Sequence, residues 1–232
     1  KENYERESRL IENELIMKND LKEAQLKYLQ AQINPHFLFN SLNAAAQLAM
    51  MEGAENTCLF VQNMADFFRY NVRKMEKDTT LKEELELVDN YIYILNVRFA
   101  GEIHYTKQID ERVTGTMMPS MILQPLIENA VNHGIRELQG EGKIHLSVYS
   151  DDGMVCVKVE DNGVGIEPEV IEKIMRGESA HSHSQRDSAG IGMDNVINRL
   201  KRYYNMEHVI EIRRLEERGT EVLIYLKRED IR

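Results

Sequence analysis

The spacing of apolar residues changes once along this chain, close to Gly101, and that change constrains the fold more than any other feature. Before Gly101, apolar residues recur at the spacing of one face of an α-helix. After it, short segments alternate between apolar and polar residues and are separated by turn residues, as expected for strands. We therefore expect a multidomain chain, in which an all-α helical part is followed by an α+β two-layer sandwich.

A heptad repeat predicts a coiled coil in the first part of the chain. Charged residues separate the apolar positions of this repeat, which are Leu10, Met17, Ala24 and Ala31. Such a seam is typical of helices that pair along their length. We expect one helix from about Tyr4 to Met51. It should kink just before His36, because Pro35 removes a backbone donor and clashes with the preceding turn.

Two further helices are predicted before the change in spacing. One follows the break at Gly53 and runs from about Asn56 to Lys74. The other starts at a capping box formed by Thr80 and Glu83 and ends near Phe99. Helices connected in this way form hairpins, and two hairpins form a four-helix bundle. We expect a homodimer, because an isolated hairpin would leave its large apolar side chains in water.

The second part of the chain is predicted to contain a mixed sheet with helices on one face. The strands are expected at about 103–109, 143–150, 154–160, 209–215 and 220–226. The helices are expected at about 119–135, 167–175 and 193–204. The segment 177–189 is rich in small, polar and charged residues, so we expect a mobile loop that a ligand orders.

Composition limits the classes of function. The formal net charge of −10 argues against a nucleic-acid-binding surface, so we expect no direct contact with nucleic acid. Cys58 and Cys156 lie far apart and lack metal-ligand spacing, which indicates neither a disulfide framework nor a zinc site. No apolar run reaches membrane-spanning length. Because the first residue is Lys1, we expect a fragment of a longer protein.

Glycine-bearing segments mark candidate ligand-binding positions. Asp161 ends a predicted strand and is followed by Gly163 and Gly165. A carboxylate there can accept a hydrogen bond from an amine such as that of adenine, and glycines let the backbone approach a ligand. Gly190 and Gly192 come directly before a predicted helix, where free N–H groups can meet a phosphate. Taken alone, each segment can also be a plain turn or helix start.

A third segment carries asparagines on a predicted helix. Asn129 and His133 are one helical turn apart and should share a face. An asparagine carbonyl is an oxygen ligand suited to Mg²⁺ that bridges phosphates. A buried amide with satisfied hydrogen bonds is the alternative for Asn129.

The order of these segments resembles the histidine-kinase branch of the ATPase superfamily that also includes gyrase, Hsp90 and MutL. The resemblance covers about residues 119–226 and implies a Bergerat-type domain with ATP and Mg²⁺ as ligands. It implies that Asn129 holds Mg²⁺, that Asp161 reads the adenine amine and that Thr220 helps to bind adenine through water. The other nucleotide-binding positions that it implies are Asn132, His133, Gly163, Gly165, Gly190, Gly192 and Asn195.

The segment 32–43 around His36 strongly resembles the phosphoacceptor box of LytS-type sensor histidine kinases. This resemblance implies an enzyme of a two-component system, a protein histidine kinase that uses ATP to phosphorylate its own His36. Neutral imidazole is a good nucleophile near neutral pH, which agrees with that role. The phosphoryl group would then pass to an aspartate in the receiver domain of a response regulator, often one with a LytTR-type DNA-binding domain.

The same resemblance implies a domain organisation and a cellular location. The expected domains are a signalling coiled-coil helix at 1–32, dimerisation and phosphotransfer helices at 33–100 and an ATP-binding domain at 101–232. The chain would be the cytoplasmic portion of a membrane-anchored bacterial protein, with its sensor region upstream.

Two departures from the family patterns leave alternatives open. Phe37 follows His36 where better-known histidine kinases carry an acid, so no general base is assigned. Asn40, one turn on, could hold the other ring nitrogen of His36. Pro125 stands where gyrase-like ATPases carry a water-activating glutamate, which disfavours hydrolysis. The alternatives are a gyrase- or Hsp90-like ATPase and a pseudokinase scaffold that binds ATP.

Overall fold

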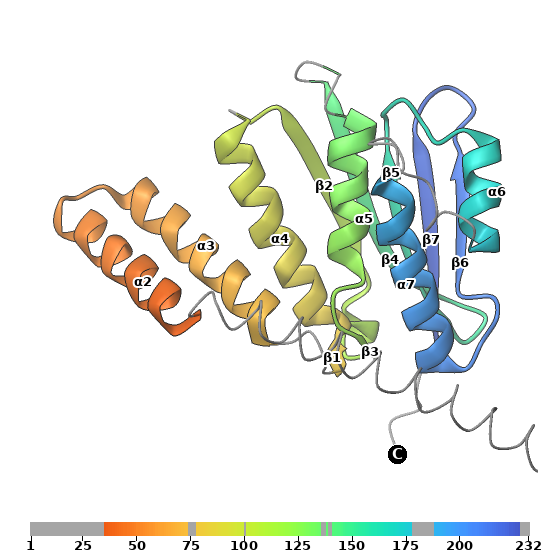
Figure 1. Ribbon diagram of the computed structural model, residues 1–232, viewed down its shortest axis with the longest axis horizontal. Coiled ribbons are helices and arrows are strands. Elements are labelled where there is room, and N and C mark those ends of the chain that lie inside the picture. The colour runs from red at the N-terminus through yellow and green to blue at the C-terminus, as the bar shows by residue number, and fades with distance from the viewer. Residues whose placement is uncertain are drawn as a thin grey trace, which may run out of the picture.

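A computed structural model of the chain describes residues 35–73, 78–99, 101–135, 138, 141–177 and 188–227. The described elements form a helical hairpin and a sheet layer, with a further helix between them (Figure 1). The predicted coiled coil upstream of residue 35 and most of the predicted loop at 177–189 lie outside the described residues.

Helices α2 (Pro35–Met51) and α3 (Glu55–Arg73) form the hairpin, which confirms the helix expected after Gly53 and the part of the preceding helix that the structure describes. Gly53 has a φ of 71°, a left-handed conformation that suits glycine at a turn. The buried side chains between the two helices are small, namely Ala46, Ala49 and Cys58. Larger apolar side chains stay exposed, with exposed fractions of 59% for Leu48 and 83% for Met51. The hairpin therefore presents an apolar face to solvent.

Helix α4 (Leu81–Arg98) begins at the predicted capping box. The Thr80 hydroxyl accepts a hydrogen bond from the Glu83 N–H at 3.3 Å, and the Thr80 N–H donates to the Glu83 carboxylate at 3.1 Å. Helix α3 packs on one side of α4, and the sheet layer packs on the other (Figure 1). The side chains of α4 that join the core of the sheet layer are Leu81, Leu85, Val88, Ile92 and Leu95. Helix α4 is thus a packed element that touches both parts.

Five strands form a mixed sheet in the order β2-β4-β5-β7-β6. Strands β2 and β4 are parallel, and the other neighbouring pairs are antiparallel. Both predicted β-hairpins and the α+β class of this part are confirmed. The bounds are β2 (Ile103–Ile109), β4 (Gly142–Asp151), β5 (Met154–Asp161), β6 (Ile210–Arg214) and β7 (Thr220–Lys227).

Helices cover one face of this sheet, as expected. Helix α4 is joined there by α5 (Leu123–Asn129), α6 (Pro168–Arg176) and α7 (Ser188–Tyr204), as Figure 1 shows. The core lies between these helices and the sheet, and Leu146 of β4, Leu200 of α7 and Ile224 of β7 are fully buried in it. A short 3₁₀ helix, η1 (Glu111–Val113), follows β2.

The predicted helix at 119–135 is wrong at both ends. Strand β3 (Met117–Pro119) occupies its start and pairs antiparallel with β1 (Asp78–Thr80) in a separate two-stranded sheet. At its other end, the π-helical segment η2 (Ala130–Ile135) replaces the expected last turns. The β1–β3 pairing joins residues far apart in the sequence, so a local pattern does not reveal it.

The predicted helix at 193–204 starts too late. Helix α7 begins at Ser188, so Gly190 and Gly192 lie within its first turns rather than before it. Glycine has a low helix propensity, which is why the pattern suggested a start after these residues.

Candidate functional site

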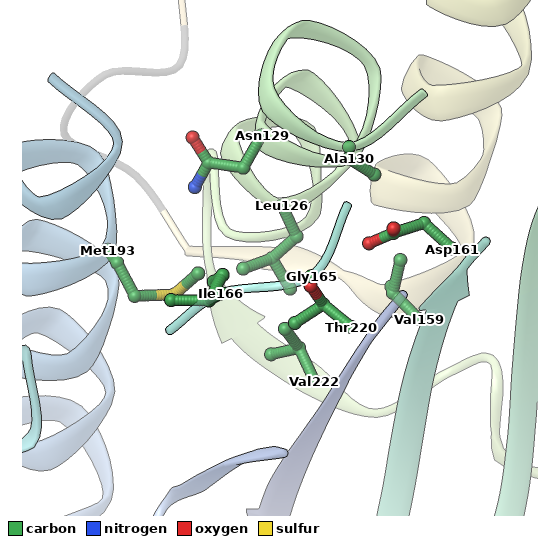
Figure 2. A pocket seen from close by; sticks show the side chains of 11 residues that line it. Leu126, Asn129, Ala130, Val159, Asp161, Gly165, Ile166, Met193, Thr220 and Val222 are labelled. Carbon is green, nitrogen blue, oxygen red and sulfur yellow. The ribbon is translucent and has the colours of Figure 1, made fainter. Parts of the chain in front are cut away.

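A pocket lies between α5, α7 and the adjacent ends of β5 and β7 (Figure 2). Its polar side chains are those of Asn129, Asp161 and Thr220. The rest of the lining is apolar side chains and glycines, namely Leu126, Ala130, Gly134, Val159, Gly165, Ile166, Met193 and Val222. A concave, largely apolar surface with a few polar groups is the usual form of a small-molecule site.

Asp161 is the last residue of β5, and its exposed fraction is 8%. Its Oδ1 atom accepts a hydrogen bond from the Gly163 N–H at 2.7 Å. Burial raises the pKa of Asp161 above its ordinary value, while hydrogen bonds from Gly163 and Thr220 act in the opposite direction. Because the carboxylate has lost part of its solvation, a donor from a ligand would stabilise its charged form.

The turn after Asp161 packs directly on the π-helical segment. A Cβ atom on Gly163 would lie 2.2 Å from the backbone of Gly134, and the Val164 N–H donates to the Gly134 oxygen at 3.2 Å. A Cβ atom on Gly134 would lie 2.8 Å from Oδ1 of Asp161. The sequence suggested that Gly163 gives room to a ligand, but in the structure it gives room to Gly134. Gly165 does line the pocket.

Asn129 is the last residue of α5, and Figure 2 shows it on the opposite side of the pocket from Asp161. The π-helical segment begins at the next residue, and its wider turn changes the offset between successive side chains. The expected shared face of Asn129 and His133 therefore does not carry over from an α-helix, and the His133 side chain lies outside the described residues. Asn132 is exposed and does not line the pocket.

Helix α7 contributes Met193 to the pocket, with an exposed fraction of 2%. Gly192 and Asn195 lie on either side of it on the same helix, and the pocket lining includes neither of them. The surroundings of Gly190 lie outside what the structure describes. Met193 and Gly134 are lining residues that the sequence did not suggest. In the sequence, Met193 has the spacing of an ordinary core residue. Gly134 lies at the pocket only because of contacts made in the folded chain.

His36 lies on α2, far from the pocket, with α3 and α4 between α2 and the pocket helix α5 (Figure 1). Its side chain is exposed. The Nδ2 atom of Asn40 lies 3.3 Å from its Nδ1 atom and 3.5 Å from its Nε2 atom. The expected neighbour relation of His36 and Asn40 is therefore present within one turn of α2.

Oxygen ligands at the pocket are few. Among the residues that the structure describes, no group of three or more His, Cys, Asp or Glu side chains could hold a metal ion. Mg²⁺ usually takes one or two protein oxygens and completes its shell with phosphates and water, so the single amide oxygen of Asn129 is compatible with it.

Among the helices that the structure describes, none is both long and apolar enough to cross a membrane.

Known protein families match two successive segments of the chain. Residues 24–103 match the family described as "Histidine kinase". Residues 118–230 match "Histidine kinase-, DNA gyrase B-, and HSP90-like ATPase", and this segment contains every residue that lines the pocket.

Individual curated proteins and solved structures are also similar to this chain. The chain is 36% identical to the sensor histidine kinase YpdA of Escherichia coli (strain K12), over 88% of this chain and 34% of that protein. It is 32% identical to the sensor protein LytS of Bacillus subtilis (strain 168), over 87% of this chain and 33% of that protein. The solved catalytic domain of histidine kinase ThkA is 17% identical, with a TM-score of 0.49 over 65% of this chain and 95% of that chain.

The chain spans about a third of the length of the curated relatives it matches. Within that span, the helical segment with His36 and the sheet layer with the pocket occur in the same order as the two family matches. The chain belongs to the sensor histidine kinases, and its sheet layer is a histidine kinase-, DNA gyrase B- and HSP90-like ATPase domain.

Proposed function

We propose that this chain is the kinase core of a sensor histidine kinase in a two-component system. The pocket binds Mg-ATP, and the γ-phosphoryl group passes to His36 and then to an aspartate of a response regulator. The observation that carries the proposal is the position of Asp161, a buried carboxylate in a largely apolar pocket. A planar ring with an amine at its edge fits such a site, and adenine is a ring of this kind.

The pocket offers separate places for the two ends of ATP. Asp161 accepts a hydrogen bond from the exocyclic amine of adenine. Thr220 lies close enough to hydrogen-bond the same carboxylate and to hold a bridging water. Asn129 lies on the opposite side of the pocket from Asp161 (Figure 2), where it would supply one oxygen to Mg²⁺ held by the phosphates. The metal would supply neutralisation of the charge on the phosphates.

His36 is the proposed nucleophile. The ring nitrogen without a proton forms the bond to the γ-phosphorus, and the bond from that phosphorus to the oxygen of the leaving ADP breaks. The phosphorylated ring is at first positively charged, and it becomes neutral when the other ring nitrogen loses its proton. Asn40 holds the ring in place, because its amide lies within reach of both nitrogens. Asn40 is not a base, so the proton leaves to solvent or to a group on a partner chain.

Transfer requires that His36 and the pocket meet, and within one chain α3 and α4 separate them (Figure 1). Either the hairpin moves relative to the sheet layer or the hairpin of a partner chain delivers the histidine. A homodimer fits both routes, and the exposed Leu48 and Met51 support it. Residues 1–32 then form the signalling coiled coil, 33–100 the dimerisation and phosphotransfer helices, and 101–232 the ATP-binding domain.

We further propose that this chain is the cytoplasmic portion of a longer, membrane-anchored protein whose sensor region lies upstream. The partner is a response regulator receiver domain, and LytTR-type regulators are the first to test because LytS is among the relatives.

A gyrase-like ATPase is the main competing function. Pro125 lies in α5, one turn before Asn129, and its side chain has no group that could activate water. Steady ATP hydrolysis without a protein-bound phosphoryl group is therefore not expected.

The test is incubation with γ-labelled ATP and Mg²⁺. A kinase yields a protein-bound label that is lost in acid and kept in base, which is the behaviour of a phosphoramidate. A hydrolytic ATPase yields labelled free phosphate and no protein-bound label, and a pseudokinase scaffold binds ATP and yields neither product.

A further inference from the structure

A buried carboxylate outside the pocket accepts four hydrogen bonds. Glu84 of α4 has an exposed fraction of 0%. Its Oε1 atom accepts from the Met121 N–H and the Tyr70 hydroxyl, each at 2.7 Å. Its Oε2 atom accepts from the N–H groups of Ile122 at 2.9 Å and Leu123 at 3.0 Å. One carboxylate thus joins the hairpin helix α3, helix α4 and the start of α5.

At the α5 end, Glu84 supplies the cap that the helix itself lacks. The first N–H groups of a helix have no partner within it, and a negative charge is favourable there. The N-cap residue of α5, Ile122, makes no side-chain cap hydrogen bond. The residue before it, Met121, has a φ of 59°, which is unfavourable for a residue with a side chain. Glu84 therefore determines where and in which direction α5 begins.

The position of α5 matters because this helix carries part of the pocket. It has seven residues and ends at Asn129, and Leu126 in its middle also lines the pocket. A helix this short has little room to bend. A shift at its first residue therefore moves the side chains that face ATP.

At the hairpin end, Glu84 is held through Tyr70 of α3. The Tyr70 side chain is half-buried, and burial together with the nearby Glu84 carboxylate raises its pKa, so the hydroxyl remains a donor. One turn earlier on α3, the ring of Phe67 stacks on that of Tyr91 of α4, with 5.5 Å between ring centres. These two contacts fix α3 against α4 beside the carboxylate.

We propose that Glu84 is a positioning residue that couples the hairpin carrying His36 to the nucleotide helix α5, with Tyr70 as its link to the hairpin. This inference rests on the proposed function, because it concerns the same pocket. A displacement of α3 removes or restores one of the donors to Glu84, and the other donors set the start of α5. Because coupling between sites is reciprocal, nucleotide in the pocket must also alter the hairpin near Tyr70.

The test compares Tyr70→Phe with Tyr105→Phe in the full chain. Tyr105 is also a partly buried tyrosine, but its hydroxyl has no hydrogen-bond partner in the described structure. Hydrogen exchange of residues 55–73 is measured with and without Mg-ATP. We expect Mg-ATP to change exchange in the wild type and in Tyr105→Phe, and to leave it unchanged in Tyr70→Phe while ATP is still bound.

Labelling kinetics give a second readout that a purely structural role would not move. In Tyr70→Phe, the ATP dissociation constant should stay within about twofold of the wild type, while the rate of His36 labelling at saturating ATP should change about fivefold or more. If Tyr70 acts through Glu84, the double variant with Glu84→Gln should label at the rate of Glu84→Gln alone.

The outcomes separate the two claims. Equal exchange responses and equal labelling rates in Tyr70→Phe and Tyr105→Phe would overturn the coupling, as would additive effects in the double variant. A wild type that binds ATP without labelling His36 would contradict the proposed function. The exchange comparison would still show whether Tyr70 couples the hairpin to the pocket. A wild type that binds no ATP would overturn both.

Discussion

Gly163 and Gly134 lie in direct backbone contact, although 29 positions separate them in the numbering and they belong to different sequence segments. The contact joins the turn after β5 to the π-helical segment after α5, and both elements line the pocket. This contact therefore holds the turn after Asp161 against the segment that follows Asn129. Neither residue needs to touch ATP to control the shape of its site.

Gly163→Ala should distort the pocket. Its Cβ atom would lie 2.2 Å from the Gly134 backbone, so the turn after Asp161 must move. Overpacking of this kind typically costs about 1–3 kcal/mol, and we expect a lower melting temperature and ATP binding weaker by about tenfold. The matched control is Gly115→Ala, because a Cβ atom there meets nothing within 4 Å. Wild-type ATP affinity in Gly163→Ala would contradict this role.

Asp161→Asn should have opposite effects on stability and on ATP binding. Burial raises the pKa of Asp161 in the folded chain above the ordinary value of 3.8. A group whose pKa is raised on folding stabilises the protein below its unfolded pKa, and this stabilisation is lost as the pH rises through the folded pKa. Without ATP, the variant should therefore melt above the wild type at about pH 7, and the difference should shrink toward pH 3.8.

The same variant should bind ATP more weakly. A hydrogen bond to a charged group contributes about 1.5–3 kcal/mol, which corresponds to tenfold or more in affinity. Glu217→Gln, at an exposed position, controls for the loss of one charge. Calorimetric melting and ATP titration measure the two effects. A variant that melts below the wild type at every pH and keeps its ATP affinity would contradict both roles of Asp161.

The local parts of the fold were the ones that the sequence predicted well. Thr80 and Glu83 are three residues apart, and both of their capping hydrogen bonds are present. The two β-hairpins are likewise local. The start of α5 was missed because Glu84, a residue from another helix, caps it. The π-helical segment was missed because no residue pattern distinguishes it from a continued α-helix.

Some residues of the candidate site could also be predicted from the sequence, and others could not. Asn129, Asp161, Gly165 and Thr220 do meet at one pocket, although they come from three different segments of the sequence. Each of them could be recognised from its residue type and from its place beside a predicted strand or on a predicted helix. The apolar residues that complete the pocket have the same periodicity as the core, so composition and spacing do not distinguish them. Gly134 was missed because its role depends on contact with Gly163.

Leu48→Glu should separate the proposed dimer. The Leu48 side chain is 59% exposed on α2, and burial in a partner interface would stabilise the dimer by about 1.5–3 kcal/mol for each fully buried large apolar side chain. A charge at that position removes this contribution and must also be desolvated. Sedimentation velocity should show a dimer for the wild type and a monomer for Leu48→Glu.

The control for this change is Met175→Glu, since Met175 is 43% exposed on α6, away from the hairpin. It should sediment as the wild type does. A monomeric wild type, or equal dimerisation of Leu48→Glu and Met175→Glu, would rule out the hairpin as the dimer interface.

The role of His36 as phosphoacceptor is tested most directly by labelling His36→Gln with γ-labelled ATP and by measuring its ATP affinity. We expect complete loss of the acid-labile label with an ATP dissociation constant within about twofold of the wild type, because α3 and α4 separate α2, which carries His36, from the pocket helix α5 (Figure 1). An acid-labile label that persists in His36→Gln would contradict this role, because another residue would then be the phosphoacceptor.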